Sequence, residues 1–187
     1  MEEKANKRVA KTKEMLKSAL TELLKVQSFD RISVKGICEK AGVNRSTFYV
    51  HYSCPRDLID EMEKDILNHL PKVESNEPKD IVASFSRLME YVKNNSSVVE
   101  VLMRDGVDNS FGETLMRAVM DKYNKYLLIN DDAERTRRCY IFCITGAIGI
   151  VRDWIDKGFS YSTEEIAETI IELAFNVMGV NNISLHA

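Results

Sequence analysis

The chain has 187 residues, of which 44% are hydrophobic and 29% charged, with a formal net charge of −3. This length fits one or two small domains with a sizeable core, and the composition excludes a disordered chain. No apolar run approaches the length of a membrane span, and the polar start Met-Glu-Glu-Lys-Ala-Asn-Lys-Arg has no apolar core. We therefore expect no membrane partner and no secretory signal.

The residue types favour helix throughout, so the predicted fold class is all-α. Only three prolines and eight glycines occur, among abundant Leu, Glu, Lys and Met, which are good helix formers. There is no strand pattern of any length and no internal repeat. Four cysteines without paired spacing indicate free thiols in a reducing compartment, and we therefore expect a cytoplasmic protein.

The first predicted helix runs from about Arg8 to Val26. It carries an apolar stripe at helical spacing, formed by Met15, Leu16, Ala19, Leu20, Leu23 and Leu24. Lysine and arginine crowd its start, where positive charge opposes the helix dipole. Three interpretations of this start are open: a phosphate offsets the charge, a flexible arm reaches a DNA minor groove, or the segment is a frayed, solvated tail.

Residues 32–58 carry the pattern of a helix-turn-helix, a unit that places one helix in the major groove of DNA. Ser33 is placed to cap the first helix, and Gly42 stands where that helix must stop. In the second helix Phe48 and Tyr52 are four residues apart and are expected to face inward. The other side chains of that helix carry the guanidinium, hydroxyl, phenol and imidazole groups that reach phosphates and base edges.

We expect DNA contacts from both helices and from the turn that follows them. Arg45 is the candidate for base readout, because its forked donors match the two acceptors of guanine. Ser33 and Lys35 are expected near phosphates, and Asn44 is expected to cap the second helix. The predicted DNA-binding set is Ser33, Lys35, Asn44, Arg45, Ser46, Thr47, Tyr49, His51 and Arg56.

The charge distribution favours nucleic acid only for the N-terminal third. Residues 1–60 hold 12 Lys and Arg against 8 Asp and Glu, whereas the remainder holds 14 against 21. A basic N-terminal region on an otherwise acidic protein is expected if only that region contacts phosphate.

Three runs in this region closely resemble the DNA-binding domain of the TetR (tetracycline repressor) family, namely 29–34, 37–43 and 46–52, followed by Asp57-Leu58. The resemblance implies a homodimeric, all-helical transcription factor with an N-terminal three-helix unit that binds operator DNA. It also implies C-terminal helices that form a ligand pocket and the dimer interface. At one position the chain departs: Pro55 stands where the family usually carries a phosphate-contacting lysine, and whether Arg56 replaces that contact is open.

The predicted domains are a helix-turn-helix DNA-binding domain, residues 1–70, and a C-terminal helical effector-binding and dimerisation domain, residues 71–187. A helix from Pro55 to about Leu70 closes the first, and the polar, proline-containing stretch 71–78 is the best linker candidate. Serine 96 or 97 is expected to cap a short helix. The helices predicted beyond the linker are Lys79–Asn94, Val98–Arg104, Ser110–Leu128, Asp132–Lys157 and Thr163–Met178.

The stretch Tyr140–Ile155 is apolar on nearly all sides, so it must be buried nearly all round, and a second subunit is the expected cover. With the last helix it predicts a four-helix bundle about a two-fold axis, and residues 148–159 also resemble one common C-terminal domain type of the family. The predicted dimer residues are Ile144, Ile148, Val151, Ile155, Ile166, Ile170, Leu173 and Val177.

A set of methionine and aromatic residues is expected to line an effector cavity, because the resemblance implies one and such side chains suit apolar pockets. Ordinary core packing is the alternative for each member. The set is Phe85, Met89, Met103, Phe111, Met116, Met120, Tyr123, Tyr140 and Phe142.

Two other features of the sequence bear on chemistry: a pair of cysteines and one histidine. Cys139 and Cys143 are four residues apart on one helix face. They can be interpreted as a thiol sensor, as half of a metal site, or as ordinary core residues. His51 has no Ser-His-Asp arrangement or carboxylate pair around it, and no phosphate-binding glycine loop or zinc-helix motif occurs. We therefore expect no enzyme, no cofactor and no bound metal.

The predicted function is a DNA-binding transcriptional regulator, a ligand-responsive homodimeric repressor at a palindromic operator. Its predicted partners are double-stranded operator DNA, a second copy of the chain and a small-molecule effector. One alternative is a co-activator or co-regulator of the same fold that acts mainly through protein–protein contacts. Another is a helical small-molecule-binding protein or enzyme without DNA contact.

Overall fold

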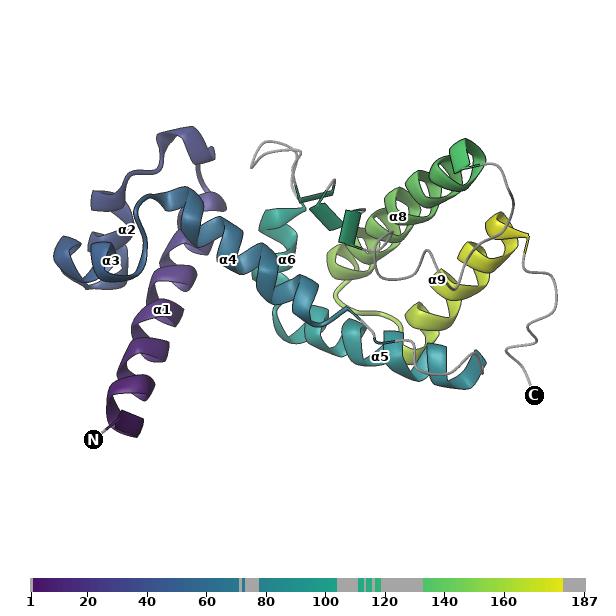
Figure 1. Ribbon diagram of the computed structural model, residues 1–187, viewed down its shortest axis with the longest axis horizontal. Helices are drawn as coiled ribbons and strands as arrows, with labels where there is room; N and C mark the ends of the chain where they lie inside the picture. Colours follow the sequence, from purple (N-terminus) through teal and green to yellow (C-terminus); the bar gives the residue numbers. More distant parts are fainter. Residues whose placement is uncertain are drawn as a thin grey trace. The chain divides into compact units, whose positions relative to one another are not determined.

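The computed structural model describes residues 2–70, 72, 78–103, 111–112, 114–115, 117–118 and 133–179. Every regular element in these segments is a helix, which confirms the all-α class (Figure 1). The elements are α1 (Glu2–Leu24), the 3₁₀ helix η1 (Phe29–Arg31), α2 (Val34–Ala41), α3 (Arg45–His51), α4 (Pro55–Asn68), α5 (Pro78–Asn94), α6 (Ser96–Leu102), α8 (Ala133–Asp156) and α9 (Thr163–Met178). The helix predicted over 110–128 lies mostly outside the described residues.

The chain forms two compact units. The first comprises Met1–Asp65 and Ser97–Asp108, and the second comprises Ile66–Ser96 and Asn109–Ala187. The division falls within α4, whereas the sequence predicts a boundary after residue 70. Most of α6 belongs to the first unit, although it follows the predicted linker in sequence.

In the first unit α1 packs against α2, and α2 packs against α3. Its core contains completely buried apolar side chains from four helices: Leu16, Leu20, Ile37, Phe48, Leu58 and Ile59. Burying each such side chain stabilises the fold by about 1.5–3 kcal/mol. The predicted apolar stripe of α1 is confirmed on its inner side, while Met15 remains 37% exposed.

The predicted ends of the two short helices are largely confirmed. Ser33 is the N-cap of α2, and its hydroxyl oxygen accepts a hydrogen bond from the backbone N–H of Gly36 at 3.1 Å. Gly42 ends α2 in the left-handed conformation with φ 68°, where a Cβ is unfavourable. Asn44 occupies the N-cap position of α3, but its side chain makes no capping hydrogen bond.

The predicted start of the first helix was wrong. Helix α1 begins at Glu2, about two turns before Arg8. Residues 2–7 therefore form neither an extended arm nor an unstructured tail.

In the second unit α9 packs against both α5 and α8. The indole nitrogen of Trp154 donates a hydrogen bond to the carbonyl of Tyr161 at 2.9 Å and so holds the loop that joins α8 to α9. Helix α9 begins with a capping box in which Ser162 and Glu165 satisfy each other's backbone N–H groups. The described helices include none that is long and apolar enough to cross a membrane.

Candidate nucleic-acid interface

Helix α3 has one face buried and one face open. Phe48 is completely buried and Tyr52, just past the helix end, is 4% exposed, so these aromatics fix the inner side. Their rings lie 5.6 Å apart between centroids. Arg45, Ser46 and Tyr49 are exposed on the outer side. The helix sequence contains no carboxylate, so this outer face offers hydrogen-bond donors and one positive charge.

The predicted DNA-binding residues of α3 are not equally placed. Tyr49 is 57% exposed, and its ring packs edge-on against Phe48 at 5.6 Å, which limits its orientation. Thr47 and His51 are half-buried, because they lie on the flanks of the inner face. Among the predicted residues of α3, Arg45, Ser46 and Tyr49 are therefore the exposed ones.

Ser33 and Lys35, the residues predicted to contact phosphate at the start of α2, are exposed. The Ser33 oxygen is used as the helix cap, but a serine hydroxyl can still donate its proton to an acceptor. The ammonium of Lys35 lies 3.7 Å from the carboxylate of Glu39 one turn along, and both side chains are about two-thirds exposed. Such a surface pair contributes little stability, so Lys35 is available to a phosphate.

Arg56 is turned toward its own helix. Its guanidinium donates to the Asp60 carboxylate at 2.7 Å and lies 3.8 Å from that of Glu63, which is 6% exposed overall. A phosphate contact from Arg56 would require it to leave these carboxylates. Pro55 opens α4 as expected for proline in a first turn.

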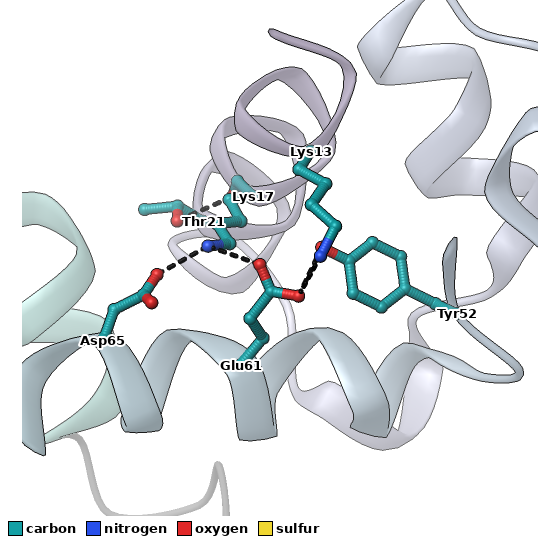
Figure 2. Close-up of polar contacts among 6 residues, drawn as sticks. All are labelled: Lys13, Lys17, Thr21, Tyr52, Glu61 and Asp65. Carbon is teal, nitrogen blue, oxygen red and sulfur yellow. Dashed lines mark hydrogen bonds and ion pairs between the residues drawn. The ribbon is translucent and has the colours of Figure 1, made fainter. Parts of the chain in front are cut away.

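Figure 2 shows a polar cluster that joins α1, the end of α3 and α4 within the first unit. The Lys13 and Lys17 ammonium groups lie 2.8 and 2.9 Å from the two oxygens of Glu61. Lys17 also pairs with Asp65, and the hydroxyl of Tyr52 donates to Glu61 at 3.1 Å. Tyr52, just past the end of α3, is thus held by a carboxylate that also pairs with two lysines of α1.

This cluster shifts the pKa values of its members. Burial alone would raise the pKa of Glu61, but hydrogen bonds and charges from Lys13 and Lys17 outweigh it and lower that pKa to about 2. Burial of Lys17 would lower its pKa, yet Asp65 and Glu61 together raise it. Burial, followed by the charge of Glu61, raises the pKa of the Tyr52 hydroxyl. Lys17 and Glu61 therefore stay charged, and Tyr52 stays protonated, near neutral pH.

Sequence reasoning missed two features of this interface. The Lys13–Glu61 pair joins residues 48 apart, and no local pattern signals such a contact. Val50, which is 75% exposed, is absent from the predicted DNA-binding set, whose members all carry hydrogen-bonding groups. Helical spacing could have found it, since it lies one turn after Ser46.

Only some of the residues predicted to line a ligand site lie together in the second unit. Met116, Met120 and Tyr123 lie outside the described residues, and Met103 belongs to the first unit. In the second unit Met89, Phe111 and Tyr140 are buried, with Phe85 half-buried. Among the described residues, a surface groove of about 700 Å³ between α5 and α9 is lined mostly by charged and polar side chains, and none of the predicted set lines it.

Phe142 requires a correction. Its side chain is 66% exposed, whereas that of Tyr140 is 1% exposed. Two residues along an α-helix turn the side chain by about 200°, so these two rings point to nearly opposite sides of α8. Phe142 therefore does not line an enclosed site with Tyr140 inside one chain.

Half of the predicted dimer residues are buried within their own subunit. Ile144, Val151, Ile166 and Ile170 are each at most 8% exposed, because α8 and α9 pack against one another. They are therefore not available to a second copy. Leu173 is 50% exposed, and the remaining three, Ile148, Ile155 and Val177, are half-buried.

The two cysteines of α8 face α9. The Cys139 and Cys143 sulfurs lie 3.8 and 4.0 Å from the carbonyl oxygens of Val177 and Ala174. Burial, and then the neighbouring Cys139, raise the pKa of Cys143 to about 11, so this thiol is not a thiolate near neutral pH. The described residues contain no group of three or more His, Cys, Asp or Glu placed to hold a metal ion.

The fold and this interface define a helix-turn-helix protein with a helical C-terminal body. A family model described as "Transcriptional regulator C-terminal region", of the TetR type, matches residues 79–176. This match covers just over half of the chain, and the chain therefore belongs to the TetR family of transcriptional regulators.

Individual relatives are distant. An uncharacterized HTH-type transcriptional regulator, YxbF, from Bacillus subtilis (strain 168) is 24% identical over 181 residues, which cover 91% of this chain and 46% of that protein. The chain thus spans about half the length of this curated relative.

Solved structures share the fold. A TetR transcriptional regulator from Streptococcus agalactiae 2603V has a TM-score of 0.64 and 19% identity, covering 93% of this chain and 99% of that one. A TetR-family regulator from Streptomyces coelicolor has a TM-score of 0.66 and 17% identity, covering 90% and 83%. At these identities the likeness establishes the fold alone.

Proposed function

We propose that this protein is a homodimeric DNA-binding regulator that acts as a ligand-responsive repressor at a two-fold symmetric operator. The observation that carries the proposal is the open face of α3. It presents Arg45, Ser46 and Tyr49 without any carboxylate, and buried Phe48 and Tyr52 hold the opposite side in place. Such a rigid helix with outward donors suits the major groove, where phosphate contacts position a protein and base contacts specify the sequence.

The dimer is supported by apolar surface that one chain leaves open. Phe142 of α8 is 66% exposed, Ile141 is 36% exposed and Leu173 of α9 is 50% exposed. Gly146 and Gly149 lie nearby on α8, and a Cβ added at either meets no atom within 4 Å. A second copy can therefore approach this helix closely, and two-fold symmetry then predicts inverted half-sites about one DNA turn apart, or a multiple of it.

The ligand response is supported by one buried polar group. Tyr140 is 1% exposed, and its hydroxyl is the one buried side-chain polar atom of the described residues that lacks a hydrogen-bond partner. Buried hydroxyls are nearly always paired, because leaving one unpaired is costly. An apolar effector with one hydrogen-bonding group would satisfy it. Such an effector regulates by favouring a dimer conformation whose α3 helices no longer fit the operator.

Repression follows from occupancy of the operator. A dimer bound in the groove excludes other proteins from the same DNA, so a promoter that overlaps the operator is silenced until the effector binds. A reporter gene behind the selected operator tests this direction. Repression predicts a lower signal when the regulator is expressed, and a higher signal would identify an activator.

The decisive experiment is selection of bound DNA from a random pool by the purified full chain, followed by gel-shift titration. Arg45→Ala should weaken operator binding by about 1–3 kcal/mol and relax specificity at a guanine. Lys79→Ala, at an exposed lysine of α5, is the matched control and should leave affinity unchanged. Affinity should also fall steeply as salt rises.

Other outcomes are informative. Uniform weakening of all operator variants by Arg45→Ala would assign that residue to phosphate rather than to a base. A purified chain that enriches no sequence and binds no DNA would reject the proposal and favour a co-regulator that acts through protein contacts.

A further inference from the structure

Val50 is the most exposed large hydrophobic side chain in the described helices, at 75%. An exposed valine forgoes the stabilisation that burial would provide, and this one belongs to the helix whose other exposed side chains are polar. It also stands in the middle of the candidate interface rather than at its edge. Val26, which is 80% exposed, lies in the turn after α1 and offers an independent comparison.

The helix geometry places Val50 on the face that carries the polar candidates. It follows Phe48 by two residues, a rotation of about 200°, and Phe48 is completely buried. Val50 therefore points almost directly away from the core of the first unit. It lies one turn after Ser46 on the same side of α3, and Tyr49 precedes it.

The apolar side chain of Val50 indicates which group on DNA it can contact. An isopropyl group makes no hydrogen bond, so it recognises an apolar group in an otherwise polar environment. In the major groove, the apolar group on the edge of a base pair is the C5-methyl of thymine. Valine is also stiff, because a β-branched side chain has one strongly preferred rotamer in a helix. Its methyl groups are thus held in position before DNA binds.

We propose that Val50 reads thymine: its isopropyl group packs against the C5-methyl of one thymine in each operator half-site. The inference rests on the proposed function, because it requires α3 to lie in the major groove. It adds a specificity-determining residue to that function, one that acts by apolar contact beside the hydrogen-bonding side chains Arg45 and Ser46.

The test uses the full chain and the operator obtained by selection, with each thymine replaced in turn by 2′-deoxyuridine. This replacement removes the methyl group and keeps every hydrogen-bonding group. One thymine per half-site should prove sensitive, with an affinity loss of about fourfold per half-site and about fifteenfold when both are replaced.

Protein variants then identify the partner of that methyl group. Val50→Ala should lose affinity for the thymine operator and bind the deoxyuridine operator as tightly as the wild type does. Val26→Ala, a matched control at an equally exposed valine outside α3, should behave as wild type on both. Circular dichroism checks the fold of each variant, and an exposed position such as Val50 should tolerate alanine.

Two results would overturn the inference while leaving the proposed function intact. One is specific DNA binding in which no deoxyuridine replacement changes affinity. The other is a Val50→Ala loss of equal size on both operators, which indicates contact with sugar or phosphate. Failure of the full chain to bind any DNA would reject the proposed function and this inference together.

Discussion

Helix α3 of the first unit and helix α8 of the second each bury one face, but their exposed faces differ in kind. Helix α3 exposes a guanidinium, a hydroxyl and a phenol, with one valine beside them. Helix α8 exposes the aromatic ring of Phe142 beside two glycines, Gly146 and Gly149. The first face suits a polar groove of nucleic acid, and the second suits another apolar helix. The comparison shows that the buried faces establish the fold, while the exposed faces indicate the partner.

The largest expected effect is a difference in stability between variants of two phenylalanines, one buried in α3 and one exposed on α8. Phe48→Ala removes a completely buried ring and should destabilise the first unit by about 3–5 kcal/mol. Phe142→Ala removes a ring that is 66% exposed and should change the stability of the isolated subunit by less than about 0.5 kcal/mol, while weakening the dimer. Amide hydrogen exchange measures each unit separately, and sedimentation velocity measures the dimer. Equal stability losses in the two variants would remove the distinction between the faces.

The next effect concerns the dimer alone. Gly149→Leu should weaken dimerisation by about 1–3 kcal/mol, because the new side chain occupies the space that a partner helix needs. Its Cβ meets nothing within 4 Å in the single chain, so the subunit itself should stay folded. Analytical ultracentrifugation over a range of concentrations gives the dissociation constant.

A control for that substitution is Ala83→Leu, at an exposed position of α5, which should leave the dimer unchanged. A Gly149→Leu protein that dimerises as tightly as wild type would show that α8 does not form the interface.

A smaller effect is the pH dependence of the stability of the first unit. The folded-state pKa of Glu61 is about 2, below the ordinary 4.5, so its pairing stabilises the fold at any pH above about 4.5. That contribution is lost as pH falls from about 4.5 to about 2. Since the Glu61 side chain is 26% exposed, we expect a loss of about 1–2 kcal/mol. Urea unfolding at pH 7 and pH 3, in wild type and in Glu61→Gln, measures it.

Glu61→Gln should show a smaller loss of stability between these pH values than wild type. Glu39→Gln, which removes an exposed carboxylate of α2, is the matched control and should behave as wild type. An unchanged pH dependence in Glu61→Gln would mean that the cluster in Figure 2 does not stabilise the first unit.

The smallest effect compares the two serine caps. Ser33→Ala at α2 and Ser162→Ala at α9 each remove a hydrogen bond of 3.1 Å to a backbone N–H and should cost about 1 kcal/mol. Ser162 also belongs to a capping box with Glu165, so its loss should be the larger. Thermal unfolding of both variants checks this order, and a larger loss at Ser33 would contradict it.

The parts of the fold set by local rules could be predicted from sequence. A cap residue, a glycine in the left-handed region and a regular apolar spacing act over a few residues, and so α2 and its stop at Gly42 were found. The limits of α9, from Thr163 to Met178, were also predicted correctly. Helix α1 began earlier than predicted, because residues 2–7 have no apolar spacing that would signal a helix.

The parts set by long-range packing could not be predicted. Periodicity shows that Tyr140, Ile144 and Phe142 lie on an apolar helix, but it does not say which side packs against α9. The pair of Lys13 with Glu61 joins α1 to α4, and either residue alone looks like an ordinary solvated charge. Likewise, Tyr52 was expected to face inward, but its hydrogen bond to Glu61 depends on the tertiary fold.

The measurement that tests the central proposal most directly is a chemical footprint of the full chain on DNA that it has selected. We expect protection in two inverted major-groove segments, one DNA turn apart or a multiple of it, and loss of both segments when Arg45 and Tyr49 are replaced by alanine. Protection that persists in this double variant, or a single unrepeated segment, would contradict the assignment of α3 as the DNA-reading helix of a symmetric dimer.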